Sequence, residues 1–171
     1  QADGFRDVFP IDNIPDTQGG RGRLRDDNSL NRFTASCGQS IYRGDKYPDD
    51  FDGDLIICEP VGRLIRRANV SNVNGKIVVS NFYDKSEFIA STDPNFRPVN
   101  SATGPDGCLY IVDMYRGIIQ EGNWVREGSY LRSVVKEYEL QKNIGRGRVF
   151  RVEHETTKRG PAPRMLDETP L

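Results

Sequence analysis

The chain has 171 residues, of which 36% are hydrophobic and 9% aromatic, and its 24 Lys and Arg residues nearly balance 25 Asp and Glu residues, for a net charge of −1. A nucleic-acid-binding domain normally carries a basic excess, so this charge balance argues against a nucleic-acid partner. No apolar run approaches the roughly 20 residues of a membrane-spanning helix, so we expect no transmembrane segment. The length fits one domain or a piece of a larger one.

Composition divides the chain into three parts. Residues 1–32 are rich in turn formers and predict a loop-rich lead-in, whereas residues 154–171 are charged and contain prolines, which is typical of a linker tail. Residues 33–153 carry the strand signals, with a helical insertion expected at about 124–140. The chain begins with Gln1 and not with Met, which leaves a processed product and an internal fragment as alternatives.

Short alternating runs between turn signals predict antiparallel strands through the middle of the chain. The Asn-Gly pair within Asn72–Gly75 predicts a hairpin turn, because both residues tolerate a positive φ, and Gly104–Gly107 predicts another tight turn. One helix is expected at about Ser129–Tyr138. The expected strands are Ser36–Arg43, Asp54–Cys58, Gly62–Ala68, Lys76–Phe82, Arg97–Ala102, Cys108–Asp113 and Gly147–Val152.

The strand–turn–strand plan recurs at roughly 45–50 residues, which is the spacing of β-propeller blades. A blade needs about four strands, so we expect an all-β fold: a partial β-propeller of about two to three blades, with one short inserted helix. A free piece of a propeller would expose sheet faces and edges. We therefore expect the remaining blades to come from another part of the protein or from other chains of a larger assembly.

The sequence offers little material for a metal site. The cysteines have no zinc spacing and form no haem-attachment motif, and His154 alone cannot build a histidine metal centre. Asp50–Asp54 resembles the start of a calcium loop, but Leu55 and Val61 stand where that loop needs Gly and Glu, so turn formation is the better interpretation. We expect no metal ligands and no bound haem in this segment.

Two of the three cysteines are expected to face each other. If residues 41–43 pair antiparallel with 54–56, Cys37 lies nearly opposite Cys58, within reach of a disulfide after a small register shift. A disulfide would indicate an oxidising compartment, and two buried thiols are the alternative. Cys108 lies in the middle of a predicted buried strand and is expected in the core.

Charged and aromatic residues stand at the ends of the predicted strands. Asp113, Tyr115 and Arg116 follow one strand, and a carboxylate, a phenol and a guanidinium that leave a strand together can line a pocket mouth. Glu59 follows another strand in the same way, so both acids are expected on one rim, and Arg97 begins a further strand. The alternative for the first group is an Asp–Arg ion pair that fixes the loop.

Four separated stretches, at residues 34–48, 55–67, 88–120 and 145–159, carry a family resemblance. They read TASCGQSIYRGDKYP, LIICEPVGRLIRR, FIASTDPNFRPVNSATGPDGCLYIVDMYRGIIQ and GRGRVFRVEHETTKR. In this order they resemble the C-terminal blades of a secreted bacterial β-propeller family that is similar to the pyrroloquinoline-quinone (PQQ)-dependent glucose and sorbosone dehydrogenases. Its members are often labelled membrane-bound dehydrogenases or haem-binding-domain proteins, and they typically continue into HEAT-like repeats and often into a cytochrome c domain.

The resemblance implies a periplasmic or cell-surface bacterial protein and, at best, a quinoprotein sugar or alcohol dehydrogenase with PQQ and calcium as cofactors and a cytochrome c as electron acceptor. Basic side chains hold the quinone carboxylates in such enzymes, so the resemblance points to Arg97 and Arg116 as cofactor-binding residues. Glu59, Asp113 and Tyr115 would then add hydrogen bonds to the substrate. The histidine base would belong to earlier blades, so the catalytic residues stay unknown.

Two other functions are compatible with the sequence. A non-catalytic propeller would act as a glycan-binding or scaffold subunit of a cell-envelope complex, which fits the incomplete catalytic constellation. A calcium-dependent hydrolase of the lactonase kind would need a carboxylate-and-Asn cluster, for which Glu59 and Asn100 are the local suggestions. Convergence of Arg97 and Arg116 on a central channel would favour a cofactor wall, and opposite orientations would exclude it.

Overall fold

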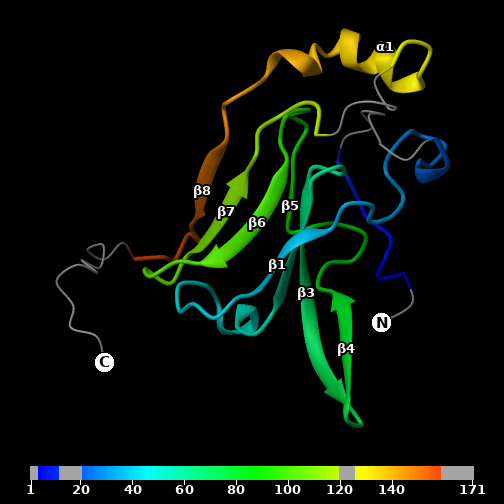
Figure 1. Cartoon of the computed structure of the whole chain (residues 1–171). Coiled ribbons are helices and arrows are strands. Elements are labelled where there is room, and N and C mark those ends of the chain that lie inside the picture. Colours follow the sequence, from blue (N-terminus) through cyan, green and yellow to red (C-terminus); the bar gives the residue numbers. More distant parts are fainter. Residues whose placement is uncertain (1–3, 12–20, 120–125, 159–171) are drawn as a thin grey trace.

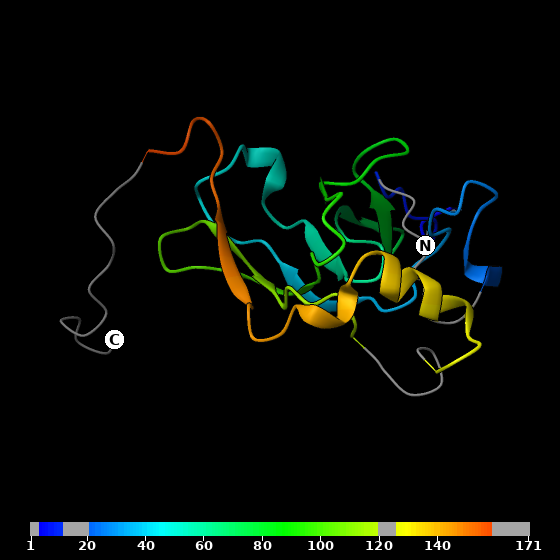
Figure 2. The same ribbon diagram turned by 90° about the horizontal axis from the view of Figure 1, so that it is seen from above.

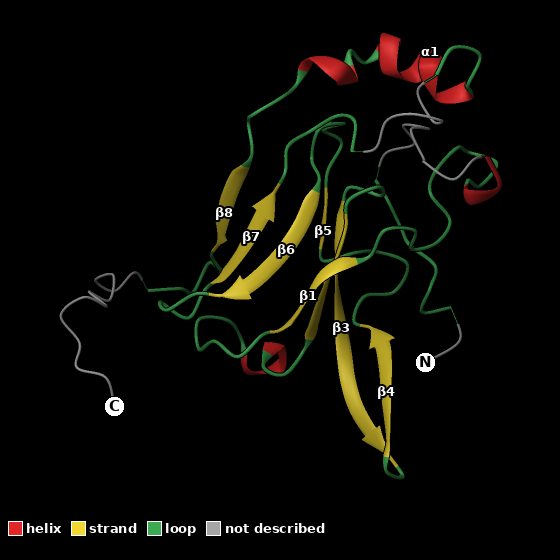
Figure 3. Cartoon of the chain, in the orientation of Figure 1, coloured by secondary structure: helices red, strands yellow, loops and turns green. Residues whose placement is uncertain are grey.

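The computed structural model of the chain describes residues 4–11, 21–119 and 126–158. This part is mostly β, with two antiparallel sheets and one α-helix (Figures 1 and 3). The expected β class is confirmed, and every predicted strand overlaps an observed one. The start of the helical insertion and the tail beyond residue 158 lie outside the described residues.

The first sheet contains five strands in the order β1-β2-β3-β4, with β5 also paired to β3. Its ten-residue strand β3 takes part in three ladders, because its first half pairs with β2 and β5 and its second half with β4. Asn74 and Gly75 take φ values of 53° and 79° between β3 and β4, which confirms the predicted hairpin (Figure 1). The strands are β1 (Cys37–Ile41), β2 (Leu55–Glu59), β3 (Leu64–Val73), β4 (Lys76–Asn81) and β5 (Ile89–Ala90).

The second sheet contains three strands in the order β6-β7-β8, namely β6 (Pro98–Thr103), β7 (Leu109–Asp113) and β8 (Arg148–Val152). In the view from above, β8 lies on the opposite side of the molecule from the N-terminal segment (Figure 2). The strand β8 forms one edge of its sheet among the described residues. This arrangement leaves one side of its backbone without a neighbouring strand in the described part of the chain.

Within the residues that the structure describes, helical structure is confined to short segments. The helix α1 (Tyr130–Glu137) and the 3-10 helix η4 (Leu140–Lys142) stand between β7 and β8, and two more 3-10 turns are η1 (Arg21–Arg23) and η2 (Asp49–Phe51). Apolar residues of the insertion pack in a cluster of their own, made of Ile118, Val134, Val135 and Leu140. The predicted helix is thus confirmed. Within the described ranges, no helix has the length and apolar character needed to cross a membrane.

The two sheets pack on each other through β1 and β2 on one side and β6 on the other. Backbones approach closely where β1 meets β6, because a Cβ atom on Gly38 would lie 2.3 Å from the Cα atom of Asn100. The hydroxyl groups of Ser40 and Ser101 share a 2.7 Å hydrogen bond in the same region. The main core comprises Tyr42, Phe51, Ile56, Cys58, Ile65, Phe96, Leu109 and Ile111.

The N-terminal lead-in is fastened to the first sheet by one arginine. Arg66 of β3 donates hydrogen bonds to the backbone carbonyls of Phe5 and Asp7, the latter at 2.7 Å. It also forms a buried ion pair with Glu87, whose carboxylate accepts a hydrogen bond from the backbone N–H of Phe9 at 3.0 Å. The described part of this loop is therefore held in a defined position by side chains that are distant in sequence.

Candidate functional site

Glu59, expected on a substrate-facing rim, is completely buried at the end of β2. Its carboxylate accepts hydrogen bonds from the backbone N–H groups of Thr34 (2.9 Å), Ala35 (3.0 Å) and Val61 (3.1 Å). Burial raises the pKa of the Glu59 carboxyl above its ordinary value, and these N–H donors oppose the rise. The side chain holds the protein's own loops together.

Arg97, expected to contact a cofactor, is also buried, with 2% of its surface exposed. Its guanidinium donates hydrogen bonds to three backbone carbonyls: those of Pro60 (2.9 Å), Arg116 (3.1 Å) and Gly117 (2.7 Å). The residue therefore ties the end of β2 to the loop that follows β7. Arg97 and Arg116 meet through the guanidinium of Arg97 and the backbone carbonyl of Arg116.

Asp113 at the end of β7 is completely buried, and it also stabilises the loop that follows β7. One carboxylate oxygen accepts hydrogen bonds from the backbone N–H groups of Arg97 and Tyr115, both at 2.8 Å. The other accepts one from Nε of Arg148 at 2.9 Å, in an ion pair. The guanidinium of Arg148 also lies 3.6 Å from the ring centroid of Tyr115. An Asp–Arg ion pair thus fixes this loop, but its arginine is Arg148 of β8 and not Arg116 of the group considered in the sequence.

These contacts decide how well the described residues fit the cofactors that the resemblance implies. The guanidinium of Arg97 is already engaged by carbonyl oxygens, so it does not fit a quinone carboxylate. No group of three or more His, Cys, Asp or Glu side chains in the described ranges is placed to hold a metal ion such as calcium. For the lactonase alternative, Asn100 is exposed and binds the N–H of Ser101 at 2.8 Å, whereas Glu59 is buried.

The two cysteines predicted to face each other do so. Cys37 of β1 lies directly opposite Cys58 of β2 in the register of the ladder, which confirms the expected pairing. Both are free thiols in the structure, as is Cys108, so the expected disulfide is absent and the alternative of thiols holds here. Burial, followed by the charge of Cys37, raises the pKa of Cys58 to about 12, so this thiol is unreactive at neutral pH.

A first open site, which we call the aromatic pocket, was not predicted from the sequence. It has a volume of about 510 Å³ and lies between the N-terminal segment and the chain at the end of β4. Its walls carry four aromatic residues, Phe5, Phe9, Phe82 and Tyr83, and two carboxylates, Asp7 and Asp84. In the sequence, the aromatic dipeptide Phe82–Tyr83 next to a strand end was the one indication of this pocket. The opposite wall comes from residues about 75 positions earlier in the chain, so no local pattern shows that the two walls meet.

Packing holds the aromatic pocket in shape. The guanidinium of Arg67 lies 3.5 Å from the ring centroid of Phe82, and the rings of Phe82 and Tyr83 meet edge to face at 5.0 Å. Arg67 is itself fixed by an ion pair with Asp54 at 2.5 Å. The aromatic groups are therefore positioned before any ligand arrives, which lowers the entropic cost of binding.

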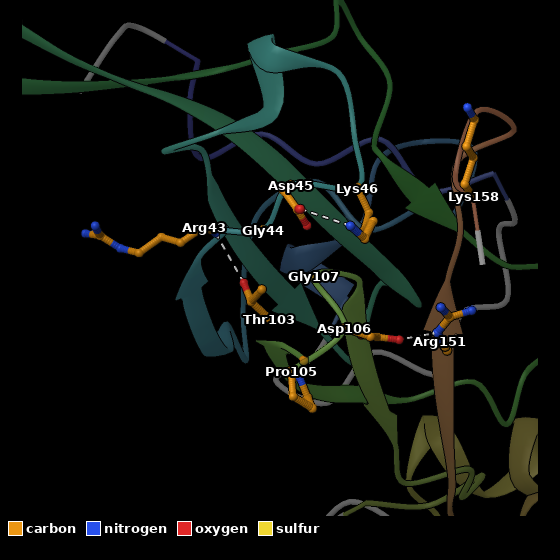
Figure 4. A pocket seen from close by; sticks show the side chains of 11 residues that line it. Arg43, Gly44, Asp45, Lys46, Thr103, Pro105, Asp106, Gly107, Arg151 and Lys158 are labelled. Carbon is orange, nitrogen blue, oxygen red and sulfur yellow. Dashed lines mark hydrogen bonds and ion pairs between the residues drawn. The ribbon is translucent and has the colours of Figure 1, made fainter. Parts of the chain in front are cut away.

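A second open site, which we call the charged hollow, has a volume of about 430 Å³ (Figure 4). It is lined by residues 43–46, by residues 103–107, and by Arg151 and Lys158. Charged residues and glycines dominate this lining, in contrast to the aromatic pocket. The tight turn predicted at Gly104–Gly107 forms one wall, but its approach to residues 43–46 depends on the packing of the two sheets and has no local signal in the sequence.

Comparison with known proteins gives one match. A family model described as a domain of unknown function, DUF7133, matches residues 1–156, which is most of the chain. No curated protein matches the chain. No solved structure matches it either.

Proposed function

The chain belongs to the DUF7133 family, whose function is unknown, and we propose that it is a non-catalytic domain that binds carbohydrate through the aromatic pocket. Such a role fits the glycan-binding or scaffold subunit expected from the sequence, at a bacterial cell surface or in a periplasm. The observation that carries the proposal is the composition of this pocket, in which fixed aromatic rings stand beside carboxylates and an amide.

The chemistry of a sugar matches this lining. A pyranose presents apolar C–H groups on its faces and hydroxyl groups around its rim, so it stacks on an aromatic ring while its hydroxyls donate hydrogen bonds to acceptor oxygens. Phe82 and Tyr83 offer the rings, and the carboxylates of Asp7 and Asp84 offer the acceptors. The ion pair of Arg67 with Asp54 keeps the platform under Phe82 in place.

The residues that the resemblance to dehydrogenases singled out have structural roles in this segment. Glu59, Arg97 and Asp113 all bind the protein's own backbone, and each is buried. Freeing any of them for a substrate would leave buried N–H or C=O groups without partners, at a cost of roughly 1–3 kcal/mol for each group. Their geometry therefore favours a structural role and leaves ligand binding to the open pockets.

We also propose that the two sheets are neighbouring blades of a β-propeller. They pack against each other through β1, β2 and β6, and the opposite face of the second sheet exposes apolar side chains. Val112 and Val149, which are partners in the β7–β8 register, are 39% and 62% exposed. A further blade packed on this face would cover them.

The test is a binding measurement on the whole chain with a panel of neutral oligosaccharides, by isothermal titration calorimetry. We expect saturable binding that the substitution Tyr83→Ala weakens about tenfold, since an aromatic stacking contact is worth about 1 kcal/mol beyond its buried area. The matched control is Tyr138→Ala, because Tyr138 is 40% exposed and lies outside the pocket. Equal loss in both variants, or saturable dye reduction with PQQ, calcium and an aldose, would contradict the proposal.

A further inference from the structure

The strand β8 forms an edge of its sheet in the described part of the chain, and the hydrogen bonds of the ladder fix which backbone groups face outwards. The Tyr47 hydroxyl accepts a hydrogen bond from the N–H of Leu109 at 2.9 Å and donates one to the carbonyl of Val152 at 2.6 Å. Leu109 and Val152 are partners in the β7–β8 ladder, so their backbone groups face each other across it. Because neighbouring residues of an antiparallel strand face opposite sides, the N–H and C=O groups of Val149 and Arg151 are directed to the outer side of β8.

The charged side chains of β8 are neutralised by acids of the same chain. Arg148 pairs with Asp113 at 2.9 Å, and Arg151 pairs with Asp106 at 2.6 Å. Edge strands that stay unpaired are usually protected by free charges, by proline or by a β-bulge. The ladder of β8 with β7 is continuous over all five residues of the strand, and none of the five is proline. The five residues of this edge therefore carry none of these three barriers to pairing with another strand.

Apolar side chains accompany this backbone edge on both faces of the sheet. Val149 is 62% exposed and Phe150 is 38% exposed, and as neighbours in a strand they lie on opposite faces. Val149 shares its face with Val112, its partner in β7. On the other face the ring of Phe150 meets that of Phe96 edge to face, with 6.2 Å between the centroids. A strand that pairs with β8 thus finds apolar contacts above and below the new ladder.

The strand β8 is complementary to a second copy of itself. A two-fold axis relates antiparallel copies by placing each residue on the same face in both, so the pairing can be centred on one residue. In the register centred on Phe150, Val149 of one copy lies opposite Arg151 of the other, so the outward backbone groups meet and each such pair exchanges two N–H···O=C bonds. Arg148 then lies opposite Val152, and no arginine lies directly opposite another. A register centred on Arg151 would instead set two like charges against each other.

We propose that two copies of this chain associate by antiparallel pairing of β8 with β8 across a two-fold axis, in the register centred on Phe150. The two three-stranded sheets then form one continuous six-stranded sheet. The strand β8 lies on the opposite side of the molecule from the N-terminal segment that lines the aromatic pocket, so this pocket stays open in the dimer (Figure 2). The association therefore does not depend on the proposed function.

Sedimentation velocity of the whole chain over a wide range of protein concentrations tests the association. We expect the monomer to convert to a dimer as the concentration rises. Val149→Lys sets a charge opposite Arg151 of the other copy, and the two-fold axis repeats this unfavourable pair, so we expect the dimer to weaken about tenfold. The matched control is Val73→Lys, because Val73 belongs to β3 and is 51% exposed. We expect the control to dimerise as the original chain does.

Cross-linking tests the register. Phe150 lies opposite Phe150 of the other copy at a non-hydrogen-bonded position, where Cα atoms of an antiparallel pair are about 4.5 Å apart, a separation that a disulfide spans. The two Val149 residues are diagonal neighbours at about 7–8 Å. In a Cys37→Ser background with oxidised glutathione as the oxidant, we expect Phe150→Cys to give a disulfide-linked dimer and Val149→Cys to give much less of it.

The proposal is overturned if the chain stays a monomer at all concentrations, which would mean that another occupant covers this edge. It is also overturned if Val73→Lys weakens the dimer as much as Val149→Lys does, or if Val149→Cys cross-links as readily as Phe150→Cys. Equal urea midpoints of the two lysine variants exclude unfolding as the cause of a weaker dimer. If Val149→Lys lowers the midpoint, the cross-linking result decides.

Discussion

Arg66 and Glu87 form an ion pair in which neither side chain is exposed. Nε of the arginine lies 2.9 Å from Oε2 of the glutamate, and Nη2 of the arginine donates a second hydrogen bond to Oε1. The same arginine binds the carbonyls of Phe5 and Asp7, and the same carboxylate binds the N–H of Phe9. Two charges buried in this way are stable only together, because each has lost its hydration.

The substitution Glu87→Gln tests this dependence. It keeps the size of the side chain but leaves the guanidinium of Arg66 buried without its counter-charge, so we expect the free energy of unfolding to fall by about 3–5 kcal/mol. Urea denaturation followed by circular dichroism measures the change. Glu137→Gln removes an exposed carboxylate from α1 and is expected to change stability by less than about 0.5 kcal/mol. Similar values for the two variants would show that the buried pair is unimportant.

Steric contact at the charged hollow predicts that one added methyl group lowers the stability of the fold. Gly44→Ala places a Cβ atom against the backbone of Gly107, and backbone cannot move aside as a flexible side chain can, so we expect a loss of about 1–3 kcal/mol in thermal or urea unfolding. Gly22→Ala is the matched control, because nothing lies within 4 Å of its added atom and its φ is not positive. A neutral Gly44→Ala variant would mean that the two turns separate easily.

The cysteines are expected to react with thiol reagents in a fixed order. Cys37 is only partly buried, whereas burial raises the pKa of Cys58 to about 12 and Cys108 is completely buried. In the native protein we expect Cys37 to be alkylated first, and the other two only after unfolding, as mass spectrometry of digests would show. The variant Cys37→Ser should lack the early product. An isolated protein lighter by two hydrogen atoms would instead reveal the disulfide that the register of β1 and β2 permits.

The buried carboxyl of Glu59 predicts how stability changes with pH. Its pKa is raised in the folded state, chiefly by burial, so the folded protein holds this proton more tightly than the unfolded chain does. Stability is therefore expected to fall as the pH rises from the ordinary value of 4.5 towards the raised pKa. The variant Glu59→Gln should lack this decline. Burial also raises the pKa of Asp54, so the difference in stability between the original protein and the variant, measured by urea denaturation at each pH, separates the contribution of Glu59 from that of Asp54. Parallel pH profiles for the two proteins would contradict the assignment.

Local patterns were sufficient to predict seven of the eight strands in the described residues and the helix, whereas the two-residue strand β5 (Ile89–Ala90) was not predicted. Alternation gave β7, predicted at Cys108–Asp113 and observed at Leu109–Asp113, and the Asn-Gly pair gave the turn between β3 and β4. The register that sets Cys37 opposite Cys58 also followed from local numbering, because the loop between β1 and β2 fixes the pairing. Each of these features depends on residues that are close together in the chain.

The sites depend on distant residues and were missed for that reason. A charged residue at a strand end gives the same pattern whether it faces a ligand or its own backbone, and only the packed structure shows that Arg97 meets carbonyls of residues 60, 116 and 117. The pairing of Asp113 with Arg148 joins residues 35 positions apart. The propeller arrangement of the sheets stays a proposal, since it depends on how several sheets pack around a common axis and the described residues form two sheets.

The double use of β3 bears on the order in which the chain folds. Its outer half and β4 are joined by a two-residue turn, so their ladder closes a very short loop and forms on the microsecond scale typical of hairpins. The inner half of the same strand then presents an extended template on which β2 and β5 dock. We expect β8 to join the second sheet later, because β7 and β8 are separated by the whole helical insertion and their pairing has a high contact order. The hairpin of β3 and β4 has one of the shortest loops to close, and we expect it to form before β8 pairs with β7.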